Sequence, residues 1–436
     1  MTDPYVLAAI CTGLLFGLIL MQVPVGGAML AAGLVGISVH QDAHTALIVL
    51  VNETTGMLTS LDLATIPLFL IMGALLSAAG YSKDIYDAIA ALVGHRRGGL
   101  SYATIGGCAV FGSVCGSSTA TVATFTKAAL PEMLARGYSP AIASGSIAAG
   151  GALKSLIPPS TAMILYAVAT NTFVIDLFRA ALLPMLITIA LNMIAIAIAA
   201  HLVPKAFPVA LPRTFSQRRA ALANAVPVLA LLLLVFGGLY GGVFTVNEAA
   251  SVAAVLALLL CVVRRRLTWR SLLEGLCTAA EATAMIYIIM LGATIFGYFL
   301  GVVRVPELAS SFVGSLDVPP LLIIALLLLF YLVLGAIFDE IAAMLITLPF
   351  VLPIVVGLGY DPIWWGIINL IIIELGMIVP PIGIAVFIIH GMMPSISLRV
   401  IYGGVMPFVV ADLFALAVLT LFPVLSLIGV KILGGG

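Results

Sequence analysis

Long runs of apolar residues recur along this chain and restrict the folds that it can adopt. Residues 5–22, 222–240 and 321–336 are each long or continuous enough to belong to a helix that crosses a bilayer. Because the hydrocarbon core holds no water, every backbone N–H and C=O group there must be paired within the protein, as an α-helix does. Charged residues make up only 8% of the chain, against about 25% in soluble proteins. We expect an all-α integral membrane protein with about a dozen apolar segments of roughly 20 residues each.

The charged and metal-ligating residues argue against several classes of protein. Eighteen Lys and Arg residues balance eighteen Asp and Glu residues, so the chain has no positive excess for nucleic acid. The five cysteines and five histidines are dispersed, at spacings that match neither a disulfide framework nor a metal site. A membrane enzyme would need a catalytic cluster such as a zinc motif or paired intramembrane aspartates, and the sequence shows none. We expect no enzymatic activity, no cofactor, no metal centre and no nucleic-acid partner.

The two halves of the chain contain the same pattern of prolines and glycines. The offset is 222 residues at five positions, and it also places Pro158–Pro159 on Pro380–Pro381. A shared offset at so many turn-forming residues indicates an internal duplication. The matching positions are Leu130, Pro131, Gly137, Tyr138 and Pro140 in the first half, and Leu352, Pro353, Gly359, Tyr360 and Pro362 in the second.

The basic residues indicate that the two repeats have opposite orientations in the membrane. Lys and Arg favour cytoplasmic loops, yet the basic run at residues 95–97 corresponds to residues 315–317, which contain no basic residue. Lys83 against Arg304 is the exception. We predict inverted-topology repeats, joined by a cytoplasmic linker at residues 204–219, with both chain termini on the outer side.

Each half contains a proline pair inside an apolar segment. Adjacent prolines remove two backbone donors and clash with the preceding turn, so the helix must break there. A single proline in a membrane helix usually produces only a kink, whereas broken segments at corresponding places in two repeats mark a transporter binding site. The freed carbonyl groups can ligate a cation, and the start of the second half-helix can face an anion.

A second unusual stretch precedes each proline pair. Residues 112–126 are small and rich in hydroxyl groups, and the equivalent second-half stretch carries the acidic pair Asp339 and Glu340. Close helix packing through small residues would explain the first stretch, and an exposed loop end would explain the second. We instead predict that each stretch is the tip of a re-entrant helical hairpin that meets the broken helix of its own repeat. Two oxygen-lined sites suited to Na⁺ would result, with substrate between them.

Together these pieces resemble the large membrane subunit of the tripartite ATP-independent periplasmic (TRAP) transporters. The resemblance covers nearly the whole chain and includes "GSVCGSSTATVA", "LGAIFDEIAAMLITLPFVLPIV" and "IIIELGMIVPPIGIAVFII" in this order. It implies an elevator-type secondary transporter of the bacterial inner membrane that imports organic acids, such as carboxylates or sialic acid, with Na⁺. It also implies two partners, a small membrane subunit and a periplasmic substrate-binding protein.

The repeat pattern divides the chain into five parts and names the candidate ligands. Scaffold helices occupy residues 1–64 and 220–285, the hairpins with their transport elements occupy 65–203 and 286–436, and the cytoplasmic linker occupies 204–219. The expected cation ligands are Gly112, Ser113, Ser117, Ser118, Ile157 and Pro158 in the first half, and Gly335, Asp339, Glu340, Val379 and Pro380 in the second. The expected substrate-binding residues are Ser118, Thr121, Lys154, Pro159, Ser160, Thr161, Pro381 and Gly383.

Lys154 departs from the family pattern, which has a small or apolar residue at this position; the second half has Gly376 here. Its amine can contact an anionic substrate, can replace a cation in the first-half site, or can extend along apolar surface to reach water. All three interpretations are open from the sequence.

Two other functions also fit parts of the pattern. A single-component carboxylate symporter coupled to Na⁺ or H⁺ would share the paired hairpins and need no binding protein. A channel would need a continuous pore, whereas duplicated broken helices favour alternating access.

Overall fold

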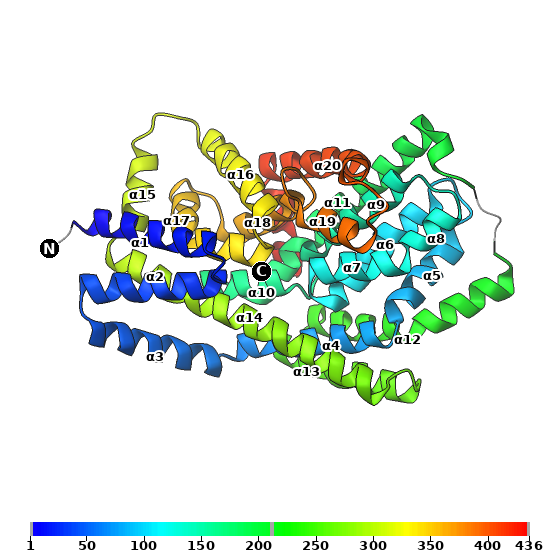
Figure 1. The fold of residues 1–436 in the computed structure, drawn as a ribbon, viewed down its shortest axis with the longest axis horizontal. Coiled ribbons are helices and arrows are strands. Elements are labelled where there is room, and N and C mark those ends of the chain that lie inside the picture. Colours follow the sequence, from blue (N-terminus) through cyan, green and yellow to red (C-terminus); the bar gives the residue numbers. More distant parts are fainter. Residues whose placement is uncertain (1–2, 210–212, 434–436) are drawn as a thin grey trace.

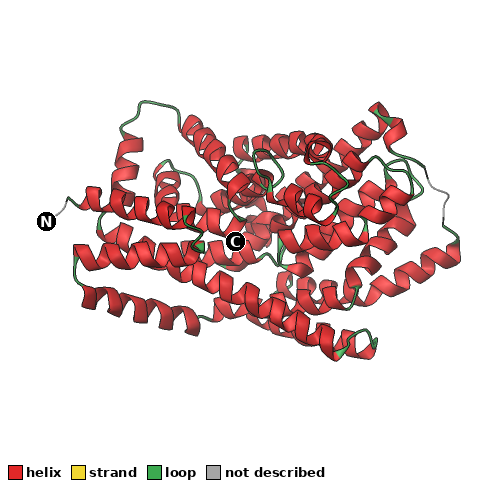
Figure 2. Cartoon of the chain, viewed as in Figure 1, coloured by secondary structure: helices red, strands yellow, loops and turns green. Residues whose placement is uncertain are grey.

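The computed structural model describes residues 3–209 and 213–433, and every regular element in these two ranges is a helix (Figures 1 and 2). The predicted all-α class is thereby confirmed. Nine helices in the described residues are long and apolar enough to cross a membrane, by length and composition. They are Leu61–Ala78, Pro140–Thr170 (taken through its break), Val174–Leu202, Phe215–Tyr240, Val246–Val263, Trp269–Val302, Pro320–Ile337, Glu340–Gly357 and Leu398–Leu421.

The same order of elements occurs in both halves. Each half contains a long helix, a short amphipathic helix, a helical hairpin, a helix broken at the proline pair, and a further long helix. In the first half these are α4 (Leu61–Ala78), α5 (Tyr81–Val93), α6 (Gly99–Cys115), α7 (Ser118–Ala128), α8 (Leu130–Ala135), α9 (Pro140–Ala152), η1 (Leu153–Leu156), α10 (Thr161–Thr170) and α11 (Val174–Leu202). In the second they are α14 (Trp269–Val302), α15 (Val305–Gly314), α16 (Pro320–Ile337), α17 (Glu340–Gly357), α18 (Pro362–Gly376), α19 (Ile384–Met392) and α20 (Leu398–Leu421).

The remaining helices flank these two sets. They are α1 (Pro4–Leu20), α2 (Val25–His40), α3 (Ala43–Thr59), η2 (Pro204–Ala206), α12 (Phe215–Tyr240), α13 (Val246–Val263) and α21 (Val424–Leu433). In Figure 1, α1, α2 and α3 lie at one end of the molecule, and α5 and α8 lie toward the other. The inverted orientation of the repeats, the elevator arrangement and the five domain boundaries remain predictions.

Small residues allow the close contact between α2 and α14, which run side by side (Figure 1). A Cβ atom added at Gly26 would lie 2.6 Å from the carbonyl carbon of Ile288, and one at Gly292 would lie 2.2 Å from the carbonyl oxygen of Gly26. Helices in lipid associate through such backbone approach rather than through burial of apolar surface from water. Larger side chains at these two glycines would force the pair apart.

The predicted linker at residues 204–219 is only partly irregular. It starts with the short helix η2, and residues 210–212 lie outside the described residues. Helix α12 already begins at Phe215, because Thr214 and Gln217 form a capping box that satisfies the first backbone N–H groups.

Candidate functional site

The first hairpin tip is a two-residue turn between α6 and α7. Gly116 takes a left-handed conformation (φ +71°), which glycine adopts without steric cost. The Ser117 hydroxyl accepts a hydrogen bond from the backbone N–H of Ala120 and so caps α7. The tip is therefore built by glycine and a serine cap, in a stretch where the sequence predicts a tight turn.

The second hairpin tip lies between α16 and α17. Asp339 precedes α17 and its carboxylate accepts from the backbone N–H of Ile341 at 3.1 Å. A carboxylate is favoured at this place because a helix N-terminus carries partial positive charge. Glu340, the first residue of α17, points instead into the protein and is buried. The acidic pair thus has two different roles.

Each tip contacts the broken helix of its own half, as the sequence predicts. In the first half, the Thr161 hydroxyl at the start of α10 donates to the carbonyl oxygen of Gly116 at 2.5 Å. In the second half, the backbone N–H of Gly383 donates to the carbonyl oxygen of Ala336 at 3.2 Å. Both the Pro158–Pro159 and the Pro380–Pro381 peptide bonds are cis.

A cluster of buried polar side chains joins the two halves between these contacts. Burial of so many charged and hydroxyl groups within apolar helices is costly unless they pair with one another. The first half contributes one amine and three hydroxyl groups, and the second half contributes two carboxyl groups. The cluster, called the cross-repeat cluster below, consists of Ser118, Lys154, Ser155 and Thr161 with Glu340 and Glu374.

Serine hydroxyls connect the two carboxyl groups of the cross-repeat cluster. Ser118 Oγ lies 2.5 Å from Glu374 Oε1 and 3.4 Å from Glu340 Oε2. Ser155 Oγ bonds the same two oxygens at short range. Glu374 Oε2 is buried and has no hydrogen-bond partner in the part of the chain that the structure describes.

Lys154 supplies the positive charge of the cluster. Its Nζ atom lies 3.5 Å from Glu340 Oε1 and 3.4 Å from Thr161 Oγ1. The side chain is fully buried, so its amine does not reach water as a lysine at the edge of a membrane does. The amine faces the Glu340 carboxylate, and its contact with an anionic substrate stays a prediction.

Ser113, a predicted cation ligand, and Thr121, a predicted substrate-binding residue, both donate hydrogen bonds within their own helices. The Ser113 hydroxyl donates to the carbonyl oxygen of Val110, and the Thr121 hydroxyl donates to that of Ser117. Such bonds within one helix are the usual state of Ser and Thr in apolar surroundings. Like the Ser117 and Asp339 caps, they leave these side chains outside the cross-repeat cluster.

The two proline loops differ in exposure. In the first half Ile157, Pro158, Pro159 and Ser160 are all buried, whereas in the second half Pro380 and Pro381 are exposed and Val379 is partly buried. The predicted glycine ligands lie at close helix contacts: Gly112 meets the Lys154 side chain, and Gly335 meets the backbone of Ile373. The structure thus brings Ser118, Lys154, Thr161 and Glu340 together and leaves the other predicted residues around them.

Sequence reasoning missed two members of the cluster, Ser155 and Glu374. A signal existed for Glu374, since it is the one ionisable residue in the apolar stretch 364–380, and such a residue marks a functional position by default. Ser155 carried no signal beyond its place next to Lys154.

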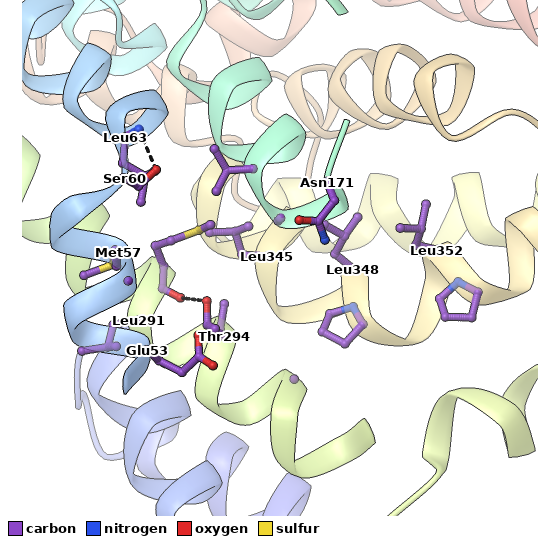
Figure 3. A pocket seen from close by; sticks show the side chains of 18 residues that line it. Glu53, Met57, Ser60, Leu63, Asn171, Leu291, Thr294, Leu345, Leu348 and Leu352 are labelled. Carbon is purple, nitrogen blue, oxygen red and sulfur yellow. Dashed lines mark hydrogen bonds between the residues drawn. The ribbon is translucent and has the colours of Figure 1, made fainter. Parts of the chain in front are cut away.

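A cavity of about 540 Å³ lies between α3, α14, α10 and α17. Glu53 and Thr294 line one side, and Leu348 and Asn171 line the other (Figure 3). None of the predicted substrate-binding residues lines this cavity. In this conformation the space expected between the two tips is filled by the cross-repeat cluster.

Comparison with known proteins gives the family. The family model described as "Tripartite ATP-independent periplasmic transporter, DctM component" matches residues 12–425. The chain belongs to this DctM family. Among similar proteins is the C4-dicarboxylate TRAP transporter large permease protein DctM of Pseudomonas aeruginosa, 34% identical over 84% of this chain and 85% of that protein. Others are the sialic acid large permease SiaM of Vibrio cholerae (27% identical; 94% and 96% covered) and the 2,3-diketo-L-gulonate large permease YiaN of Escherichia coli (29%; 85% and 87%).

Solved structures of transporters share the fold. The Alcanivorax borkumensis YdaH transporter matches with a TM-score of 0.57 at 17% identity, covering 88% of this chain and 89% of that one. Neisseria gonorrhoeae MtrF matches with a TM-score of 0.55 at 11% identity, covering 88% and 85%. This DctM-family chain is therefore a multi-pass transport protein of the inner membrane, and its predicted family is confirmed.

Proposed function

We propose that this chain is the membrane permease of an importer that moves an organic acid into the cell with a cation gradient, Na⁺ being the coupling ion. It would act as the large subunit of a three-part system. A small membrane subunit would complete the membrane part, and a periplasmic binding protein would deliver the substrate.

The proposal that the substrate is an acid rests on the relatives and on the broken helices. Similar permeases are named for C4-dicarboxylates, sialic acid and 2,3-diketo-L-gulonate, which carry carboxylate groups, and one is named for isethionate, which carries a sulfonate group. In this chain α10 and α19 both start at the proline loops, at Thr161 and Ile384. The free N–H groups and the dipole at a helix start favour a negatively charged group.

The charge balance of the cross-repeat cluster supports coupling to a cation. Two buried carboxyl groups, Glu340 and Glu374, face the single ammonium group of Lys154. An uncompensated charge at this depth costs several kcal/mol, so the second carboxyl group must either take a proton or be balanced by a bound cation. Hydroxyl and carboxyl oxygens are hard ligands of the type that Na⁺ accepts. This imbalance is the observation that carries the proposed coupling.

Reconstituted uptake tests the proposed function. The permease and its small subunit are placed in proteoliposomes, and uptake of C4-dicarboxylate or sialic acid is measured with and without the cognate binding protein. We expect uptake only with the binding protein and an inward Na⁺ gradient, with a response steeper than a one-ion hyperbola. Uptake that is indifferent to Na⁺ at constant pH and voltage would refute Na⁺ as the coupling ion. Full uptake without the binding protein would favour the single-component symporter instead.

A further inference from the structure

The side chain of Lys154 packs against α6, close to the first hairpin tip. A Cβ atom added at Gly112 would lie 2.9 Å from Lys154 Cβ and 3.0 Å from Lys154 Cγ, so the aliphatic part of the lysine packs directly on this glycine. The amine then lies 3.4 Å from Thr161 Oγ1, which itself bonds the carbonyl oxygen of Gly116 in the tip turn. The positive charge is therefore held beside the tip where the sequence predicts the first cation site.

The equivalent contact in the second half has no space for a side chain. Lys154 corresponds to Gly376 at the offset of 222 residues. A Cβ atom added at Gly376 would lie 2.6 Å from the carbonyl carbon and 2.7 Å from the Cα atom of Gly335. Here the broken helix packs with its backbone against the tip helix. In both repeats the broken helix packs against the helix that leads to the hairpin tip, and only in the first repeat does a charged side chain lie at this contact.

The ammonium group at this position has the charge and the partners of a bound monovalent cation. It carries one positive charge, lies 3.5 Å from Glu340 Oε1 and is shielded from water. Two carboxyl groups meet in the cluster, and without Lys154 nothing in the described residues would balance Glu340. A cation held by a covalent bond pays no entropy of binding and cannot leave during transport.

We propose that Lys154 is a built-in cation that permanently occupies the first-half site, so that exchangeable Na⁺ binds only outside it. The inference rests on the proposed coupling to Na⁺ and adds that this chain exchanges one Na⁺ fewer than a permease with glycine at this position. Removal of the ammonium group should convert its place into a new Na⁺ site that depends on Glu340.

Binding of ²²Na⁺ to the purified full-length chain tests this without knowledge of the substrate. Lys154→Gly should bind one Na⁺ more than the parent protein. Its melting temperature should rise with NaCl and not with choline chloride, because Na⁺ then neutralises Glu340. Lys154→Ala provides a second uncharged variant if the glycine loosens the 3₁₀ turn at Leu153–Leu156.

Two controls identify the source of the additional site. Lys154→Arg keeps a fixed positive charge and should gain no Na⁺. The double variant Lys154→Gly/Glu340→Gln lacks the anionic partner and should lose the gained site again. If Lys154→Gly and Lys154→Ala both bind no more Na⁺ than the parent, the inference is refuted. If the parent itself binds Na⁺ while these variants gain none, the proposed Na⁺ coupling stands and only the role of Lys154 fails.

Discussion

Removal of the Glu340 charge should destabilise the protein through the ion pair that it breaks. The side chains of Lys154 and Glu340 are 0% and 5% exposed, and Nζ and Oε1 are 3.5 Å apart. At an effective dielectric constant of about 20, two unit charges at this distance attract by roughly 5 kcal/mol. Removing one partner of a buried pair typically costs about 3–5 kcal/mol, because the other charge stays buried without compensation. This applies to Lys154 in the Na⁺-free protein, where the second carboxyl group of the cluster, Glu374, is neutralised by a proton.

This loss converts into a measurable change of melting temperature for Glu340→Gln. An unfolding entropy of about 2.1 cal/mol/K per residue gives roughly 0.9 kcal/mol/K for a chain of 436 residues. A loss of about 4 kcal/mol then lowers the melting temperature by about 4 °C. The assay is thermal unfolding of the purified protein in detergent, followed by intrinsic fluorescence at constant pH and salt.

A double variant separates the ion pair from other effects of the substitution. In Lys154→Met/Glu340→Gln both charges are absent, and the amide oxygen of the introduced glutamine can still accept from Ser155. Replacing a buried ion pair by neutral groups is often close to neutral in stability, so most of the lost melting temperature should return. Asp412→Asn is a matched control, because Asp412 is equally buried but bonds only Asn192, at 2.6 Å, and forms no ion pair in the described residues. It should cost about 1 kcal/mol, with no recovery from Lys154→Met. Additive losses in the double variant would refute the reasoning.

The remaining predictions concern the hairpin tip, the proline loop and the orientation. Gly116→Ala should lower the free energy of unfolding by about 1–3 kcal/mol, because residue 116 has a left-handed backbone, and it should also reduce uptake. Gly80→Ala is the control: Gly80 has a similar φ of +76° and open space around it, so this variant should lose stability only. Equal uptake by both variants would count against a role of the tip. Ser160→Ala removes the cap of α10, whose hydroxyl accepts from the Met163 N–H, and should lower stability by about 1 kcal/mol, as measured by thermal unfolding; Ser160→Asn, which keeps a capping group, should retain it. The orientation is tested with Ser216→Cys in a chain whose exposed Cys277 is replaced by serine. The new cysteine should not react with a membrane-impermeant maleimide in spheroplasts and should react in inside-out vesicles. Labelling in spheroplasts would refute the cytoplasmic location of the linker.

The sequence predicted the elements of the site from local chemistry. Apolar length predicted the helices, and the repeated prolines predicted both breaks. The hydroxyl-rich and acidic stretches upstream predicted the two tips that contact these breaks. These features depend on backbone geometry within a few residues, so they can be predicted from the local sequence. Na⁺ coupling, the inverted orientation and the roles of individual ligands depend on long-range placement and stay predictions.

The partners across the two halves could not be derived in the same way. Glu374 meets Ser118, 256 residues away in the chain, and Lys154 meets Glu340 at a separation of 186 residues. The repeat offset relates equivalent positions, and it carries no information about which non-equivalent positions touch. Each tip was therefore expected to hold its own cation site, which stays a prediction, and the convergence of polar groups from both halves on one cluster was not foreseen.

The cross-repeat cluster also has a mechanical consequence. Its bonds fasten α7 and η1 of the first half to α17 and α18 of the second through charged and hydroxyl groups in a dry interior. A movement of one hairpin alone would break these bonds and leave an unpaired charge among apolar side chains. This would cost several kcal/mol in every transport cycle. A displacement that carries both hairpins together leaves every bond in place. We therefore predict that the two hairpins move together, as one rigid body against the helices around them.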